Sequence, residues 1–165
     1  MSGVKGEART LGYTPGQRPT RGLPAPDGDY SCTLKFKGKE GDAGWKSKPG
    51  KFPNRAVTWN IQGTEDEVTG DEKTVTTFIS LSNKVLKQVT ELAYASGYPH
   101  AFELARYSKP GDPGVQEMKT VVDAILSFIE ENGVVMKARI GTDEYNGEEK
   151  NTVKRWLGPD EAAEA

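Results

Sequence analysis

The sequence predicts a mainly β fold with two helices (α+β), in which the helices lie between the third and fourth of five strands. Five segments have the apolar alternation of half-buried strands, and after the third segment the apolar spacing changes to that of helices. The last two segments flank Asn146-Gly147, a pair that favours a tight β-hairpin. Together these observations indicate a small, mostly β domain.

The chain of 165 residues is long enough for one domain with a buried core. Residues 1–26 are rich in Gly, Pro and Arg, which predicts a flexible basic arm. We expect the domain at residues 27–157 and a short acidic tail at 158–165. No apolar run approaches the roughly 20 residues that span a membrane, and the N-terminus has no secretory character. We therefore expect a cytoplasmic protein.

Residues 29–37 alternate between apolar and polar side chains and are expected to form the first strand. The alternation predicts that Leu34 and Phe36 face the core and that Lys35 and Lys37 face solvent. This strand should therefore have a partly basic outer face.

The second and third strands are predicted at residues 55–61 and 73–81, on either side of an acidic turn. Trp59 shares its face with apolar neighbours and is expected in the core. Phe78 shares its face with threonines and a serine, so its ring is either a stacking platform or a seat for a helix. The lysine-rich loop at 38–54 either closes over a ligand or stays solvated.

Helical spacing follows Ser82, a good N-cap, and stops at Gly97; a second helix is expected to end at Gly133. The last two strands are predicted at residues 134–141 and 150–157. This order of elements is that of a five-stranded Greek-key barrel of the oligonucleotide/oligosaccharide-binding (OB) type, with helix between strands three and four.

The pairing of the last two strands follows from the turn. If Asn146-Gly147 are the two loop residues of a type I′ turn, Arg139 lies opposite Lys154 and Lys137 opposite Trp156. These four side chains would share the outer face, where two facing cations repel each other. A phosphate between the cations would remove the repulsion, so the sequence predicts a basic-aromatic patch for nucleic acid.

Charge is distributed unevenly along the chain. Residues 1–55 hold eleven Lys/Arg and five Asp/Glu, a local charge of +6, whereas residues 56–165 have a local charge of −8. A basic region favours a polyanionic partner, since cations neutralise phosphates and aromatic rings stack bases. Exposed cations also keep strand edges soluble, so the basic residues have this second, purely structural interpretation as well. The predicted nucleic-acid-binding residues are Lys35, Lys37, Trp45, Lys46, Lys48, Lys51, Arg55, Phe78, Lys137, Arg139, Lys150, Lys154 and Trp156.

Few residues could carry catalysis. Cys32 is the one cysteine and His100 the one histidine, too few for a disulfide or a zinc site built on these residues. His100 follows a predicted helix end, where a loop histidine is the simplest interpretation. The carboxylates of Glu65-Asp66-Glu67 and Asp71-Glu72 should diverge from a turn and not converge on a metal. We therefore expect no catalytic residues, no metal and no cofactor.

Four segments carry a resemblance to a known family: Pro26-Asp-Gly-Asp-Tyr30, Leu81-Ser-Asn-Lys84, Gly97-Tyr-Pro99 and, above all, Glu144-Tyr-Asn-Gly-Glu-Glu-Lys-Asn-Thr-Val-Lys-Arg-Trp156. The sequence resembles small phage-encoded proteins that look like single-stranded-DNA-binding proteins with an OB fold. The resemblance covers roughly residues 26–157, and its closing hairpin is the most specific part.

The resemblance implies a protein, monomer or homodimer, that coats and protects single-stranded DNA in replication or recombination. RNA stays open as an alternative ligand, and replication or recombination proteins as further partners. The tail at 158–165 lacks the terminal aromatic residue that many such proteins use to recruit partners. A rival hypothesis is a protein-interaction module that binds a host or phage protein through the acidic half.

Overall fold

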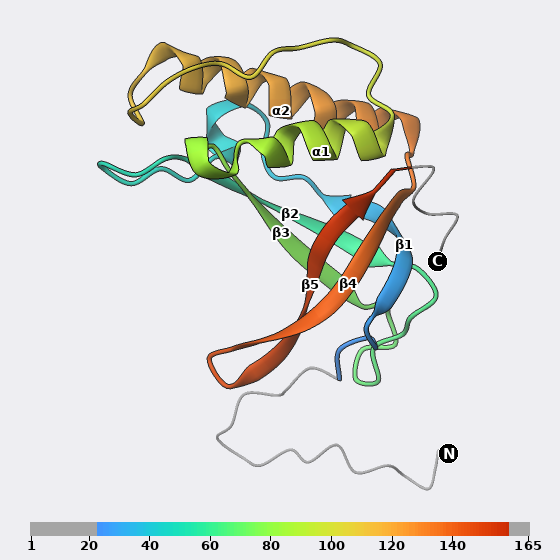
Figure 1. The fold of residues 1–165 in the computed structure, drawn as a ribbon. Helices are drawn as coiled ribbons and strands as arrows, with labels where there is room; N and C mark the ends of the chain where they lie inside the picture. Colours follow the sequence, from blue (N-terminus) through green and yellow to red (C-terminus); the bar gives the residue numbers. More distant parts are fainter. Residues whose placement is uncertain (1–22, 159–165) are drawn as a thin grey trace, which may run out of the picture.

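The computed structural model describes residues 23–158 (Figure 1). The predicted arm up to residue 22 and the tail from residue 159 lie outside the described residues. The strands are β1 (Gly28–Phe36), β2 (Asn54–Ile61), β3 (Thr74–Ser80), β4 (Met136–Tyr145) and β5 (Glu148–Leu157). The helices are α1 (Lys87–Ser96) and α2 (Pro113–Asn132), with short 3-10 turns η1 (Gly41–Gly44) and η2 (Asn83–Val85). This confirms the predicted class, mainly β with two helices between the third and fourth strands.

The five strands form one antiparallel sheet in the order β3-β2-β1-β4-β5. The edge strands β3 and β5 approach each other, with Cα atoms within 8 Å. Within residues 23–158 no ladder of hydrogen bonds joins these two strands, so the sheet is strongly curved but is not closed into a barrel.

The helix boundaries follow from local chemistry, as predicted. The Ser82 hydroxyl accepts a hydrogen bond from the Lys84 N–H at 3.3 Å and caps η2, which leads into α1. Both α-helices end at a glycine in the left-handed conformation, Gly97 with φ 73° and Gly133 with φ 57°. Pro113 begins α2, where its missing N–H costs no helical hydrogen bond.

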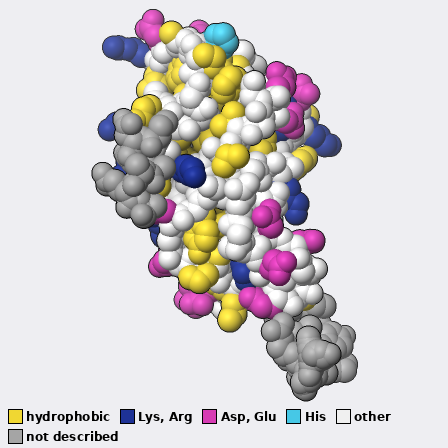
Figure 2. Space-filling view, turned by 90° about the vertical axis from the view of Figure 1, so that its right-hand side faces the viewer, with side chains coloured by type: hydrophobic (Ala, Val, Ile, Leu, Met, Phe, Trp, Pro, Cys, Tyr) yellow, Lys and Arg dark blue, Asp and Glu magenta, His cyan; other side chains and the backbone are white. Residues whose placement is uncertain are grey.

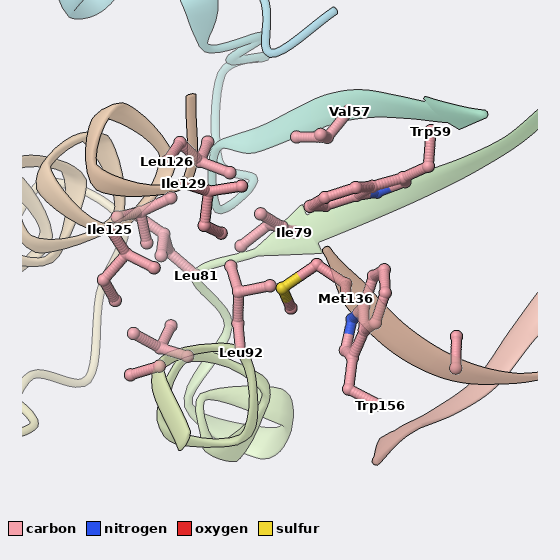
Figure 3. Packing of buried hydrophobic residues seen from close by; sticks show 14 of the residues in the cluster. Val57, Trp59, Ile79, Leu81, Leu92, Ile125, Leu126, Ile129, Met136 and Trp156 are labelled. Atoms are coloured by element: carbon pink, nitrogen blue, oxygen red, sulfur yellow. The ribbon is translucent and has the colours of Figure 1, made fainter. Parts of the chain in front are cut away.

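The core lies between the helices and the inner face of the sheet (Figure 3). Trp59 is completely buried, which confirms its predicted place in the core. Its ring meets that of Trp156 at a centroid distance of 4.7 Å, close to Met136 in Figure 3. Figure 1 shows both helices at one end of the sheet and the β4–β5 hairpin extending away from them.

A β-bulge in β1 overturns the predicted faces at the end of that strand. Leu34 of β1 lies opposite Trp59 of β2, and Phe36 of β1 lies opposite the adjacent residue of β2, Thr58. Lys35 therefore has no partner in β2 and is the extra residue of the bulge. Side chains after a bulge exchange faces. Phe36 is therefore exposed and Lys37 is buried, the reverse of the expectation from simple alternation.

A second bulge, in β5, corrects the predicted hairpin register. Ile140 lies opposite Val153 as expected, but Arg139 then lies opposite Arg155, which makes Lys154 the extra residue. Trp156 consequently lies opposite Ala138, on the buried face of the sheet. The predicted pairs of Arg139 with Lys154 and of Lys137 with Trp156 are wrong for this reason.

The chain just before β1 lies against the fold, although it was predicted to belong to the arm. The Ala25 N–H donates to the Asn151 side-chain oxygen at 2.9 Å, and the Asn151 amide donates to the Ala25 carbonyl at 3.0 Å. The Leu23 N–H donates to Glu67 at 3.0 Å. Among residues 23–158, none of the helices has the length and apolar character needed to cross a membrane.

Candidate nucleic-acid interface

Two exposed phenylalanines lie on the outer face of the β1-β2-β3 part of the sheet. Alternation along β2 and β3 places Ala56 opposite Phe78, and Thr58 opposite Thr76, on the face away from the core. Phe36 lies on the same face, opposite Thr58, because of the bulge in β1. The exposed fractions are 59% for Phe36 and 63% for Phe78. We call these two side chains and their β2 neighbours the aromatic face.

The spacing of the two rings follows from the register. Phe36 and Phe78 lie two strands apart and are offset by two residues, which places their Cα atoms about 12 Å apart by ordinary sheet spacings. Their neighbours on this face are mainly Thr and Asn, which are neutral and have hydrogen-bonding groups. A flexible chain of bases could thus contact each ring with a different base.

Lysines surround one end of the aromatic face. Lys46 lies opposite Asn54 on the side of β2 away from β3, so it continues the outer face where the chain leaves β1. The Lys51 N–H donates to the Lys48 carbonyl at 3.0 Å and closes the turn at the loop tip. Five exposed lysines of this region form no ion pair within residues 23–158; we call them the free lysines: Lys35, Lys39, Lys46, Lys48 and Lys51.

Three predicted contact residues lie in the interior instead. Arg55 is 1% exposed and forms an ion pair with Asp123 of α2. Trp45 is 7% exposed, and the Arg55 guanidinium lies 5.6 Å from the centre of its ring. Lys37 is 9% exposed and pairs with Glu130 at 3.0 Å. None of the three is available to a ligand in this conformation, so the expectation that they face solvent is wrong.

The electrostatics of this interior group are dominated by burial. Burial raises the pKa of Asp123, although the neighbouring Arg55 opposes that effect. An ionised Asp123 is therefore tolerated chiefly because the Arg55 cation lies against it. The pair has a structural role at the base of the β1–β2 loop.

The predicted patch on β4 and β5 does not form. Trp156 is 9% exposed and packs in the core. The cations that remain outside each have an acceptor: Arg139 binds Asp29 at 2.9 Å and Lys154 binds Asp143 at 2.8 Å. These hydrogen bonds hold the pKa values of both carboxyl groups below their ordinary range.

Two further cations of this hairpin, both predicted to contact nucleic acid, are also engaged. Lys137 Nζ donates to Ser31 Oγ at 2.9 Å. Lys150 lies 4.0 Å from Glu148 and 5.4 Å from the centre of the Tyr145 ring. Arg139, Lys150 and Lys154 are thus paired with carboxylates of the protein itself, in contrast to the free lysines, whereas Lys137 is bonded to a neutral hydroxyl.

The structure therefore brings together only part of the predicted site. Lys35, Lys46, Lys48, Lys51 and Phe78 are exposed in one region of the molecule, around β2 and the loop before it. The residues that sequence reasoning missed are Phe36, which alternation assigned to the core, and Lys39. No local signal marked the bulge that exposes Phe36.

Other reactive side chains lie away from the aromatic face. His100 is exposed in the loop between α1 and α2, 5.3 Å from the Tyr98 ring; Figure 2 shows the histidine at one end of the molecule, beside hydrophobic side chains. Cys32 is fully buried, and burial raises its pKa to about 12. Among residues 23–158 no cluster of three or more His, Cys, Asp or Glu side chains could hold a metal ion.

Comparison with known proteins adds no relative from which function could be transferred. No model of a known protein family matches the chain, and a search of curated proteins finds no match. The functional interpretation therefore depends on the geometry of the site and on the sequence resemblance.

Proposed function

We propose that this protein binds single-stranded DNA without catalysis and with little sequence preference, through the aromatic face and the free lysines. The observation that carries the proposal is the exposure of Phe36 and Phe78 on one strand face beside lysines that lack carboxylate partners. Exposed rings and cations on one strand face offer a surface that a ligand with both bases and phosphates can cover. Bases stack on such rings whatever their sequence, and lysines neutralise the phosphates between them.

The fold supports this ligand class. We propose that the curved sheet is a partly open barrel of the OB type, whose first loop and central strands form a common surface for oligonucleotides. The strand order β3-β2-β1-β4-β5 and the approach of β3 to β5 agree with that topology. With the sequence resemblance, this favours a cytoplasmic protein that protects single strands in phage DNA replication or recombination.

The test is a titration of the full-length protein with a fluorescent oligo-dT and with a duplex of equal length, at low salt. We expect binding to the single strand and much weaker binding to the duplex, because stacking requires exposed bases. Absence of oligo-dT binding, or equal affinity for the duplex, contradicts the proposal.

Alanine variants locate the site. Phe36→Ala and Phe78→Ala should each weaken binding roughly 5- to 150-fold, the effect of losing one stacked base. The matched control is Tyr145→Ala, which removes another exposed ring (64% exposed) among the carboxylates of the β4–β5 turn. If Tyr145→Ala weakens binding as much as Phe78→Ala, the aromatic face is not the site.

The tip of the β4–β5 hairpin favours a second candidate, a protein-interaction module. Glu144, Glu148 and Glu149 are exposed there beside Tyr145, on a hairpin that extends away from the helices (Figure 1). This tip would repel DNA but could bind a basic protein segment. Under this alternative, Glu148→Gln with Glu149→Gln weakens binding to a lysine-rich peptide and leaves oligo-dT binding unchanged.

A further inference from the structure

Five polar side chains of α2 share one face of the helix and point to the loop between β1 and β2. They recur at steps of three and four residues, the spacing of one helix face. We call them the α2 polar stripe: Gln116, Lys119, Asp123, Ser127 and Glu130. Figure 1 shows the β1–β2 connection lying against α2, and the η1 turn is the part in contact.

The two ends of the stripe hold the loop through side chains. Lys37 Nζ lies 3.0 Å from Glu130 Oε1 and donates to Ser127 Oγ at 3.3 Å. At the other end, Asp42 Oδ1 accepts from Gln116 and Lys119, at 3.5 Å each. The loop is therefore bound to α2 at two separated points.

Arg55 connects the middle of the stripe to the loop backbone. Its guanidinium donates to the carbonyls of Lys37 and Lys39, both at 2.8 Å, and pairs with Asp123. The loop is packed closely around this group. A Cβ atom on Gly44 would lie 2.0 Å from the Lys39 carbonyl oxygen and 2.9 Å from the Arg55 Cζ, so only glycine fits there.

This arrangement divides the loop into a fastened base and a projecting tip. The base, residues 37–45, is tied to α2, whereas Lys46, Lys48 and Lys51 are exposed and make no ion pair within the described part of the chain. The three lysines that could bind phosphate thus follow a segment whose backbone conformation is fixed by its contacts with α2.

We propose that α2 is the positioning element of the DNA-binding loop, and that Arg55 is a positioning residue that does not contact phosphate. The inference rests on the proposed single-strand binding, and it adds that contacts with α2 fix the conformation of the binding loop. A loop that is ordered before binding avoids the entropic cost of becoming ordered in the complex. Weakening the stripe should therefore lower affinity from a distance.

Removing a carboxylate from α2 tests the proposal, because long-range charge and loop positioning predict opposite changes in DNA affinity. If only long-range charge mattered, Glu130→Gln and Asp123→Asn would raise affinity for a polyanion slightly. Positioning predicts the opposite, a loss of about three- to tenfold as the loop base loosens. Glu131→Gln is the matched control, since Glu131 is exposed on the same helix and makes no ion pair within residues 23–158.

Arg55 itself separates positioning from phosphate contact. Lysine keeps the charge but cannot form the three directed bonds of the guanidinium. We expect Arg55→Lys and Arg55→Gln to weaken oligo-dT binding alike, with the slope of log affinity against log salt unchanged. If Arg55→Lys binds as wild type while Arg55→Gln has a shallower slope, Arg55 contacts phosphate and the inference is wrong.

Amide hydrogen exchange keeps the two proposals distinguishable. Without DNA, amides of residues 38–45 should exchange faster in Glu130→Gln than in Glu131→Gln, while β2 amides stay protected in both. If exchange rises but wild type does not bind oligo-dT, the proposed function fails and α2 still orders the loop. If wild type binds and Glu130→Gln matches Glu131→Gln in exchange and affinity, the positioning role is overturned.

Discussion

At the scale of single residues, the ring of Trp156 meets the ring of Trp59 edge-on in the core, whereas Phe78 makes no ring contact within residues 23–158. Both side chains were candidates for stacking, Trp156 because the predicted register placed it on the outer face and Phe78 because it shares its strand face with threonines and a serine. Burial separates them, at 9% exposure for Trp156 and 63% for Phe78. A base can stack only on a ring that solvent already reaches, so Phe78 remains a candidate and Trp156 becomes part of the core.

Trp156→Ala should therefore be a stability variant and not a binding variant. Loss of a buried Trp typically lowers the free energy of unfolding by about 3–5 kcal/mol, because the cavity refills only in part. Urea unfolding, followed by circular dichroism, measures this loss. Phe78→Ala is the comparison and should stay within about 0.5 kcal/mol of wild type, as exposed sites do. A near-neutral Trp156→Ala would mean that the ring does not fill the core.

At the scale of elements, much of the architecture could be predicted from local signals. The strand alternation, the Ser82 cap, the two terminal glycines and the Asn146-Gly147 turn each act within a few residues, and the elements they predict are all present. The position of Arg55 was available too. It has the same strand parity as Val57 and Trp59, so alternation places it on the buried face, although it was predicted to contact nucleic acid.

Simple alternation could not predict which face of the sheet the side chains after each bulge occupy. In β5 there was nevertheless a warning: a regular ladder would place Arg155 opposite Ala138 in the core and Trp156 outside. One extra residue at Lys154 corrects both positions at once. In β1 no comparable conflict marks Lys35, because the lysine that turns inward finds its partners on α2, far away in sequence. A local sequence pattern cannot predict such a contact between residues far apart in the sequence.

Deletions in β5 test the role of this bulge. Removing Lys154 should leave a regular ladder in which Arg155 and Trp156 keep their partners, so the protein should fold with a small loss of stability. Removing Thr152 shortens the same strand equally, but a regular ladder would then place Lys154 opposite Ile140 in the core. Burying that unpaired charge should be strongly destabilising. Thermal unfolding of both variants measures the difference.

The two deletions control each other, since strand length and hairpin turn are the same in both. Equal stability of the two variants would contradict the assigned bulge. Greater stability of the variant without Thr152 would show that Lys154 is not the extra residue.

At the scale of the whole molecule, the two groups of cations differ in whether the protein itself neutralises them. The free lysines near β1 and β2 face solvent without carboxylates, whereas Arg139 and Lys154 on β4 and β5 are bound to Asp29 and Asp143. In the described part of the basic segment, from residue 23 onward, five lysines therefore face solvent without carboxylate partners, whereas the predicted patch on the hairpin does not form. Net charge along the sequence could indicate the first but could not show the pairing in the second.

The salt dependence of oligo-dT binding distinguishes these two groups in solution. Each phosphate neutralised on a single strand contributes about −0.7 to the slope of log affinity against log salt. Lys48→Gln with Lys51→Gln should thus make the slope shallower by about 1.4, since two phosphate contacts are lost. Arg139→Gln with Lys154→Gln removes the same charge but should leave the slope at the wild-type value, because those cations already have carboxylate partners. Comparing slopes between double variants cancels any constant contribution from the rest of the chain. A shallower slope for the second pair and an unchanged slope for the first would place the DNA on the β4–β5 hairpin and not on the aromatic face.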